Sequence, residues 1–550
     1  MSELPTPITR EEIYLDAIAE DDASINLPTP NTREEIYLNA IANSLGNADL
    51  PTPITREEMY LYEIAGGGGG GGEQEEKSVV FVDHEGVVAR YTPTELKAMT
   101  EFPEPKEYEG LTFDCWNWSL ENAKQTVDSR GELIIGANYH TTDNKLHLFV
   151  KIPETKKTHK FGFASESGST ITIDFGDGSS EETLSGAGSG TVKYVSHTFE
   201  EGGSYVIKIG VSDGNNIYLS GNSSNAYSYL TGSTYAESIS SANIIEKIET
   251  PSNVIVSKYA FANMSMLNVV SVSSTMEFGD NYGYNFYSCT SLGGFVFPKN
   301  STFVPPNLFQ INCPASFIST NDSIEKIYDY SFYELYNLTN IVIPDTVEEI
   351  GRYAFAKCYS LKKIILPTAL AMIGESAFDM CYRLEDIVLQ NGITRIDGSV
   401  FSQTTSLKNL IIPSTVTSFG SDNLYMCSSL NEFSINSVFI PARTCTNSCL
   451  KKLSLGENVV TISQNSFSSC FGLSEVVIPS SVTTIESGAF GFCYSLHTIK
   501  FSRSTPPTIY STTFSNLPRT CVIMVPSGSL SAYTSAQYYP SSSTYSYVEY

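Results

Sequence analysis

A 23-residue period runs through the C-terminal half of this 550-residue chain, and it constrains the fold more than any other feature. A phenylalanine stands at six successive positions with this spacing, and a leucine takes the next place. The series is Phe286, Phe309, Phe332, Phe355, Phe378, Phe401 and Leu424. Because one unit of this size cannot bury its apolar face alone, units with such a period stack as a solenoid. We therefore predict a solenoid over residues 245–526, with irregular units at 265–325 and 436–450.

The clearest unit, Ile343 to Ile364, reads IPDTVEEIGRYAFAKCYSLKKI. Its pattern predicts a short strand at 348–350, a compact turn that carries the Ala-Phe pair, and a second short strand at 362–366. Five cysteines lie three residues after a periodic Phe or Leu, so we expect them to be small buried apolar residues. They are Cys358, Cys381, Cys427, Cys470 and Cys493. No CxxC pair occurs among the eleven cysteines, and we expect no structural metal.

These units resemble the BspA-like leucine-rich repeats, whose pattern is IP-x-x-V-x-x-I-x-x-x-A-F-x-x-C-x-x-L. In that family the repeats are surface adhesion and recognition modules. The resemblance implies that the solenoid binds a surface protein or a carbohydrate, and it does not imply catalysis.

The alternation of a strand indicates which side chains of each unit point outward. If Ile364 and Leu366 face the core, Lys363 and Ile365 face outward, and the period extends this assignment to the other units. The ligand-face candidates are Lys363, Ile365, Asp386, Val388, Asn409, Ile411, Glu432, Glu475 and Val477. They form either an ordinary solvated sheet or a ligand face with an apolar stripe. Charge reversal of Asp386 and Glu432 distinguishes these two interpretations.

Three near-copies of one motif, the first of which reads LPTPITREEIYLDAIA, occupy residues 1–65. In each copy a threonine and a glutamate have the spacing of a capping box, and a helix of about two turns with one apolar face follows. We expect these helices to dock on a partner, although they could instead pack together as a small bundle. The docking residues would be Thr9, Glu12, Ile13, Tyr14, Ile18, Thr32, Glu35, Ile36, Tyr37, Ile41, Thr55, Glu58, Met59, Tyr60 and Ile64. A glycine-rich linker at 66–77 follows.

We predict a small β-rich domain over residues 78–143. Asp83-His84-Glu85-Gly86 superficially resembles the D-x-D-G motif of phosphatases, but Glu replaces the second Asp, so a β-hairpin explains it better. The only two tryptophans lie in 110–118, where they would form a small core or an exposed sugar-binding edge.

Residues 144–214 resemble a PKD domain in the segments Phe175-Gly176-Asp177-Gly178 and His197-Thr198-Phe199. The resemblance implies a seven-stranded immunoglobulin-like sandwich. Asp174 and Asp177 would make Asx turns or hold calcium, and we favour the turns. Residues 215–244 are a transition, and residues 527–550 are either a cap or a loose tail.

The net charge and the absence of catalytic motifs in the sequence argue against several classes of function. The formal net charge of −27 argues against nucleic-acid binding, and no apolar run has the length of a membrane span. The six histidines are scattered and match no catalytic motif, so we predict a non-enzymatic protein without catalytic residues or a cofactor.

Three functions fit a mainly β protein of this organisation. The repeated LPTP-x-TREE-x-YL segments resemble N-terminal motifs in structural proteins of phages that infect gut Firmicutes, and the chain lacks a visible export signal. This resemblance implies a virion protein that docks on capsid, neck or tail proteins through residues 1–65 and presents the solenoid to the host surface or mucus. The alternatives are an adhesin on the bacterial cell surface and a cytoplasmic scaffolding protein.

Overall fold

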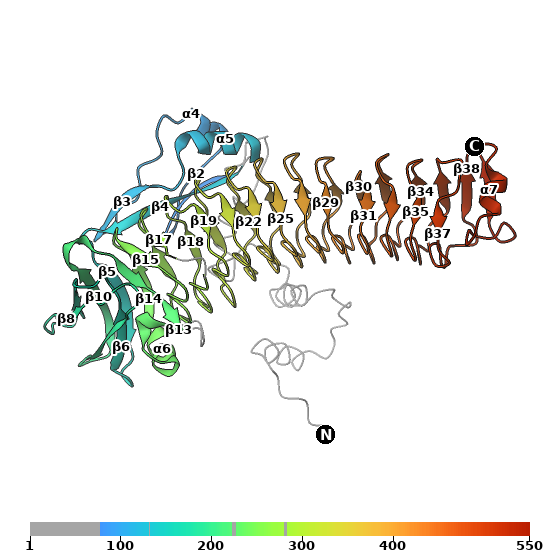
Figure 1. The fold of residues 1–550 in the computed structure, drawn as a ribbon. Coiled ribbons are helices and arrows are strands. Elements are labelled where there is room, and N and C mark those ends of the chain that lie inside the picture. Colours follow the sequence, from blue (N-terminus) through green and yellow to red (C-terminus); the bar gives the residue numbers. More distant parts are fainter. Residues whose placement is uncertain (1–77, 131, 223–226, 280–282) are drawn as a thin grey trace, which may run out of the picture. The chain divides into compact units, whose positions relative to one another are not determined.

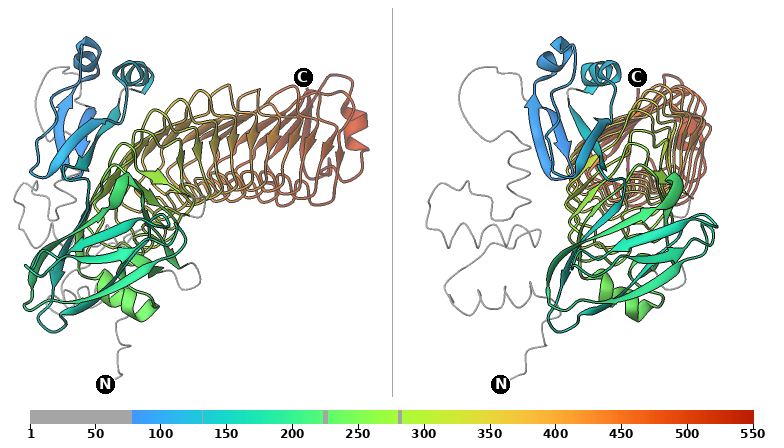
Figure 2. Two further views of the ribbon diagram at one scale, coloured as in Figure 1. Left: turned by 60° about the vertical axis from the view of Figure 1, so that its left-hand side comes forward. Right: turned by 90° about the vertical axis from the view of Figure 1, so that its left-hand side faces the viewer.

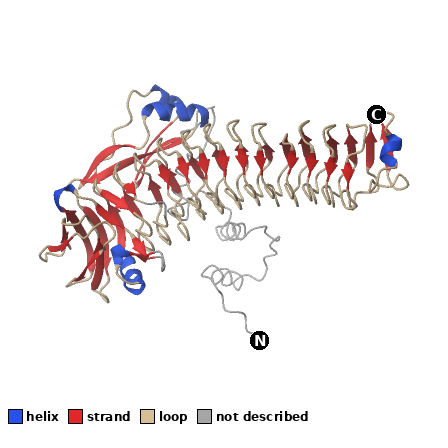
Figure 3. Ribbon diagram, in the orientation of Figure 1, coloured by secondary structure: helices blue, strands red, loops and turns tan. Residues whose placement is uncertain are grey.

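The structure is a computed structural model that describes residues 78–130, 132–222, 227–279 and 283–550 (Figure 1). The predicted docking motifs at 1–65 and the linker at 66–77 lie outside these residues. The described chain is mainly β with few helices, as the sequence predicts (Figure 3).

The first module combines a four-stranded sheet with two helices, whereas the sequence predicted a β-rich domain. The sheet order is β2-β1-β4-β3, with β1 and β4 parallel. The elements of this module are β1 (Val79–Asp83), β2 (Gly86–Tyr91), α4 (Pro93–Ala98), β3 (Leu111–Trp116), α5 (Leu120–Arg130) and β4 (Leu133–Thr141). A capping box explains the start of α4: Thr92 Oγ1 accepts the Glu95 N–H at 3.1 Å, and Glu95 Oε2 accepts the Thr92 N–H at 2.8 Å.

Two expectations for this module are confirmed. The segment after Asp83 is the turn of the β1–β2 hairpin, where Asp83 Oδ1 accepts the N–H groups of Glu85 and Gly86. Trp116 and Trp118 are both buried and pack in the module's core, so neither ring forms an exposed sugar-binding edge.

The second module is a sandwich that shares its larger sheet with the solenoid. This sheet has the order β16-β14-β5-β10-β7-β8, and β6 pairs with β9 in a second layer. The strands are β5 (Leu146–Ile152), β6 (Thr158–Phe163), β7 (Thr170–Asp174), β8 (Glu182–Ser185), β9 (Lys193–Thr198), β10 (Gly203–Val211), β14 (Ile245–Glu249) and β16 (Val269–Ser271). Residues 144–214 contribute the six strands β5 to β10 rather than the seven of the sandwich implied by the PKD resemblance, and β14 pairs with the edge of β5 and continues the sheet.

The two motifs of the PKD resemblance contact each other. Phe175 stacks on His197 with ring centroids 3.8 Å apart, and His197 Nε2 lies 2.7 Å from Asp177 Oδ2. Asp174 Oδ1 accepts the Gly176 N–H and Asp177 Oδ1 accepts the Ser179 N–H, so both acids make the expected Asx turns.

Short elements connect the sandwich to the repeats. They are η1 (Ser212–Gly214), β12 (Gly221–Asn222), β13 (Tyr227–Ser228), η2 (Tyr229–Thr231) and α6 (Tyr235–Ala242).

Each turn of the solenoid contributes one strand to each of two parallel-paired rows, as Figure 2 shows from two sides. The first row is β18 (Gly294–Val296), β20 (Phe317–Ser319), β22 (Asn340–Val342), β24 (Lys363–Ile365), β26 (Asp386–Val388), β28 (Asn409–Ile411), β30 (Glu432–Ile435), β32 (Lys452–Leu455), β34 (Glu475–Ile478), β36 (Thr498–Phe501) and β38 (Val522–Val525). The second row is β11 (Ile217–Leu219), β15 (Val254–Val256), β17 (Glu277–Phe278), β19 (Phe303–Val304), β21 (Lys326–Ile327), β23 (Glu349–Ile350), β25 (Met372–Ile373), β27 (Arg395–Ile396), β29 (Ser418–Phe419), β31 (Phe439–Ile440), β33 (Thr461–Ile462), β35 (Thr484–Ile485) and β37 (Thr508–Ile509).

The periodic residues form the core of the solenoid. Phe355 and Phe378 are fully buried and stack with ring centroids 5.3 Å apart. The five periodic cysteines are buried as expected, and the thiol of Cys381 donates to the Phe355 carbonyl at 3.2 Å. Burial raises the pKa of Cys427 to about 12, so this thiol stays neutral. The irregular unit at 436–450 is a shortened turn, because Glu432 pairs with Lys452 only 20 residues on.

The last residues form the cap, one of the two outcomes that the sequence left open. Helix α7 (Leu530–Thr534) precedes β39 (Ser546–Glu549), which pairs parallel with β38. Tyr533 is fully buried there, and its hydroxyl donates to the Arg503 carbonyl at 2.8 Å. The cap therefore covers the apolar end of the last turn.

Candidate binding face

The outward side chains of the first row form one continuous surface, which we call the strand face. It comprises the outward residues of β18 to β38. Ile364 and Leu366 are buried in the core, so Lys363 and Ile365 point outward, as the alternation predicts. Register pairing places the outward residues side by side from β22 to β26 and again from β28 to β32, and β26 contacts β28 between the two groups.

The structure places the predicted ligand-face residues on this face. Val388 is 61% exposed and Ile411 is 71% exposed, while Val477 is 42% exposed farther along the row. Ile365 is half-buried. The exposed polar members are Lys363, Asp386, Asn409, Glu432 and Glu475.

Charge on the strand face is partly paired between neighbouring turns. Lys452 Nζ lies 3.2 Å from Glu432 Oε2, and both side chains are more than half exposed. An exposed pair of this kind contributes little to stability. Asp386 is exposed between Lys363 and Asn409, its neighbours along the row. The polar residues thus flank an apolar patch of Val388 and Ile411.

The beginning of the strand face is covered by the first module of the same chain. Strand β4 contacts β16, β18, β20 and β22. Val296, Ser319 and Val342 hold the outward position of their strands that Val388 and Ile411 hold in later turns, yet they are at most 5% exposed. Val342 packs in the core of the first module. One row of equivalent positions is therefore buried at its start and exposed at Val388 and Ile411, the next turns after β24.

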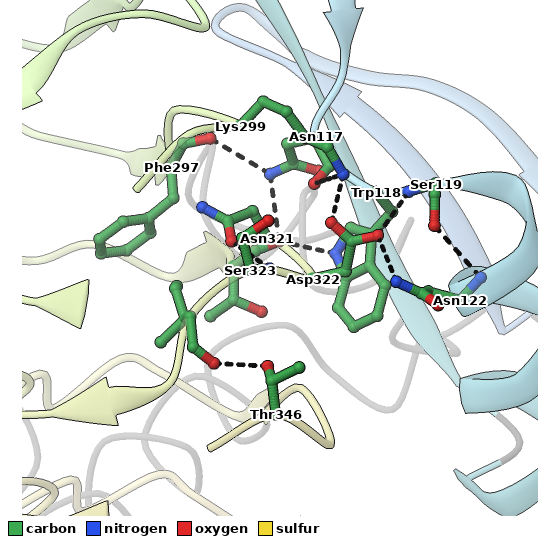
Figure 4. Close-up of polar contacts among 12 residues, drawn as sticks. Asn117, Trp118, Ser119, Asn122, Phe297, Lys299, Asn321, Asp322, Ser323 and Thr346 are labelled. Carbon is green, nitrogen blue, oxygen red and sulfur yellow. Dashed lines mark hydrogen bonds and ion pairs between the residues drawn. The ribbon is translucent and has the colours of Figure 1, made fainter. Parts of the chain in front are cut away.

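A network of buried amides holds β4 on the strand face (Figure 4). Asn117 Oδ1 accepts the Gly136 N–H at 2.7 Å, and Asn117 Nδ2 donates to the Ser319 and Thr320 carbonyls at 3.2 and 3.1 Å. Trp118 Nε1 donates to the Thr320 carbonyl at 2.6 Å. A Cβ on Gly136 would lie 2.3 Å from Val296 Cγ1, so only glycine permits this close approach of β4.

An acid lies beside this network. Asp322 Oδ2 accepts the N–H of Ser119 and the amide of Asn122, each at 2.8 Å, and Asp322 Oδ1 pairs with Lys299. Burial favours the neutral acid, but the hydrogen bonds from Lys299 and Ser119 outweigh it and lower the pKa of Asp322. Asp322 therefore acts as a charged anchor between the first module and the solenoid.

Sequence reasoning did not identify these joint residues. Their signal was the polar run Ser319-Thr320-Asn321, which stands where the regular unit has Val342-Ile343-Pro344. The run falls within 265–325, which the sequence marked only as irregular. The predicted docking residues at 1–65 lie outside the described part of the chain, so the structure does not relate them to the strand face.

The described residues hold no group of three metal-ligating side chains, and none of their helices is long and apolar enough to cross a membrane. All eleven cysteines, which lie within the described residues, are free thiols.

Comparison with known proteins identifies the repeats. The family model described as the BspA type leucine rich repeat region matches six copies, over residues 231–315, 304–431 and 438–544. No curated protein matches the chain.

Several solved structures are similar. A leucine-rich repeat protein from Bacteroides ovatus shares 23% identity over 56% of this chain and 84% of its own, with a TM-score of 0.45. A leucine rich cell surface protein from Faecalibacterium prausnitzii shares 20% identity over 52% of this chain and 81% of its own, with a TM-score of 0.29. The family model covers more than half of the 550 residues, and the chain belongs to the BspA-type leucine-rich repeat family.

Proposed function

We propose that this protein is a non-enzymatic recognition protein that attaches to a macromolecule on a cell surface through the open part of its strand face. The observation that carries this proposal is the exposure of Val388 and Ile411 in adjacent strands. Contiguous exposed apolar patches, especially those rimmed by polar residues, mark interaction sites, and these two side chains adjoin each other among polar neighbours. Location on the bacterial cell surface is part of the proposal, and it agrees with the adhesion role that the BspA-like resemblance implies.

Binding of the purified full-length chain to coated surfaces tests this function. Mucin-coated plates, cultured epithelial cells and intact bacterial cells are the three probes. We expect saturable binding to at least one of them, and the double variant Asp386→Lys/Glu432→Lys should change its affinity about tenfold, because both acids are exposed on the face.

The matched control is Ser418→Lys, an exposed position on the second row of strands. It should bind as the wild type does. No binding of the wild-type chain to any of the three probes, or equal binding by the charge-reversed variant, contradicts the proposed function.

A second candidate function is attachment to a phage virion, with the strand face presented to the host. Three copies of the LPTP-x-TREE-x-YL motif at 1–65 favour it, since repeated short helices give avidity on a partner with repeated sites. Mass spectrometry of purified virions tests it. Recovery of the chain in virions, and its loss when residues 1–65 are deleted, supports attachment, whereas recovery only from bacterial envelopes contradicts it.

A further inference from the structure

One part of the strand face is already occupied by a strand of the same chain, β4 of the first module. β4 lies across the outward positions of β18, β20 and β22, and the equivalent positions are exposed in β26 and β28. The exposed part of the face at β26 and β28 thus follows, along the same row of strands, an interface that the protein already forms. The occupant of that interface is a β-strand of a folded module.

Two kinds of contact hold β4 in place. The first contact is apolar and places the β4 backbone close to the solenoid, since Gly136 lies directly over Val296. In addition, Val342 packs in the core of the first module. The second is polar: side-chain N–H groups donate to carbonyls that directly follow the solenoid strands. Trp118 and Asn117 reach the Thr320 carbonyl, and Asn138 Nδ2 reaches the Phe297 carbonyl at 3.2 Å.

The sequence of the repeat explains why the Thr320 carbonyl has no main-chain donor from the next turn. In two later turns the residue at the position of Thr320, there the last residue of the strand, accepts a main-chain N–H from the next turn, as Ile478 does from Ser502 at 2.9 Å. The residue that would donate to Thr320 is Pro344, which has no N–H, so the carbonyl depends on Trp118 and Asn117.

The same arrangement recurs within the open face. Leu389 directly follows Val388, and the matching residue of the next turn is Pro413. The Leu389 carbonyl therefore receives no main-chain donor from that proline. It lies beside the exposed pair Val388 and Ile411, as the Thr320 carbonyl lies beside Ser319 and Val342. The apolar patch and this carbonyl together offer a partner the same two kinds of contact, apolar and polar, that hold β4 on β18, β20 and β22.

We infer that the partner is a folded β-sheet protein that lays a strand across β24, β26 and β28 and donates a side-chain N–H to the Leu389 carbonyl. This inference rests on the proposed function and names the class of its partner. The outward residues of these strands include no aromatic ring on which a sugar could pack. The surface therefore suits an apolar strand better than a carbohydrate.

The experiment uses the full-length chain on whichever of the three probes it binds, after treatment of the probe with trypsin or with periodate. Trypsin removes proteins and periodate destroys sugars. The variant Ile411→p-benzoylphenylalanine adds photo-crosslinking, and mass spectrometry identifies the peptide joined to position 411. Loss of binding after trypsin but not after periodate, with a crosslink to a strand of a folded protein, is the expected result.

Pro413→Ala sharpens the test because it adds an N–H at the position from which Ser502 donates to Ile478, so the Leu389 carbonyl gains a candidate internal donor that would compete with the partner. It should weaken binding about three- to tenfold, the effect of one hydrogen bond. Pro479→Ala makes the same change farther along the solenoid and should leave binding unchanged. Circular dichroism confirms that both variants are folded.

Other outcomes overturn the inference and leave the proposed function intact. Binding that survives trypsin and is lost after periodate identifies a carbohydrate. A crosslink between two copies of the chain identifies self-association, and a crosslink to a helix identifies another kind of protein surface. Wild-type affinity of Pro413→Ala excludes the Leu389 carbonyl as an acceptor. Failure of the wild-type chain to bind any probe instead refutes both the proposed function and the inference.

Discussion

The indole nitrogen of Trp118 donates to the Thr320 carbonyl oxygen at 2.6 Å, joining residues 202 positions apart. Both residues are buried, and Asn117 donates to the same carbonyl. A buried acceptor with fixed donors tolerates little movement, because each lost bond leaves a desolvated polar group. The first module and the first solenoid turns are therefore held together as a stiff unit that presents the open face.

Removal of the amide at this joint should destabilise the chain. Asn117→Ala removes donors and an acceptor that serve Gly136, Ser319 and Thr320, so we expect a loss of about 2–4 kcal/mol in the free energy of unfolding. Urea denaturation measures it. Thr112→Ala, an exposed position on β3, is the control and should change stability by less than about 0.5 kcal/mol. Equal midpoints for the two variants would show that the amide network is not a structural joint.

The phenylalanine stack should dominate the stability of the regular turns. Phe378→Ala leaves a cavity between Phe355 and Phe401 and should cost about 3–5 kcal/mol. Tyr382, four residues later, stacks on Tyr359 but is 38% exposed, so Tyr382→Ala should cost much less. Thermal unfolding of the two variants compares them directly, and a similar loss in both would contradict the core assignment.

Thiol reactivity should separate one cysteine from the rest. Only Cys449 is exposed among the eleven cysteines, while Cys115 is half-buried with its pKa raised by burial. We expect about one thiol per chain to react rapidly with an aromatic disulfide reagent at neutral pH, and the others to react after unfolding. The variant Cys449→Ser should abolish the rapid phase. Several fast thiols in that variant would show that the turns open readily.

Asp177 should make the sandwich sensitive to acid. Burial alone would raise its pKa, but hydrogen bonds from Ser179 and His197 lower it to about 2. A carboxyl whose pKa is lowered by folding stabilises the protein above its ordinary pKa of 3.8, and this stabilisation is lost as the pH falls from about 4 to 2. Asp177→Asn should therefore cost about 1–2 kcal/mol at pH 7 and much less near pH 2. An equal cost at both values would exclude the charged hydrogen bonds as the cause.

The period of the repeat was sufficient to predict the solenoid, its two strands per turn and its buried phenylalanines and cysteines. Local patterns also predicted the Asx turns and the hairpin after Asp83. Each of these features depends on residues close in sequence or on a fixed step between identical units. The outward residues Val388 and Ile411 followed from the same step.

The contact of the first module with the beginning of the strand face could not be predicted in this way. The contacts of Asn117 with Ser319 and Thr320 span about two hundred residues, and no local pattern encodes such a pairing. The turns also place bulky residues in the left-handed region, such as Tyr353 at φ 53° and Lys357 at φ 61°, where a sequence rule expects glycine. Stacking with neighbouring turns overrides that rule, since Lys357 donates its N–H to the Asp379 carbonyl at 2.8 Å.

The central claim is that the strand face beyond β24 binds the partner, and the double variant Val388→Glu/Ile411→Glu tests it most directly. Both side chains are exposed, so the variant should unfold at the same temperature as the wild type within about 2 °C. Its binding to the probe that captures the wild-type chain should fall by at least about tenfold, whereas Ser418→Glu on the second row should bind normally. Unchanged binding by the folded double variant would contradict the claim and place recognition elsewhere on the chain.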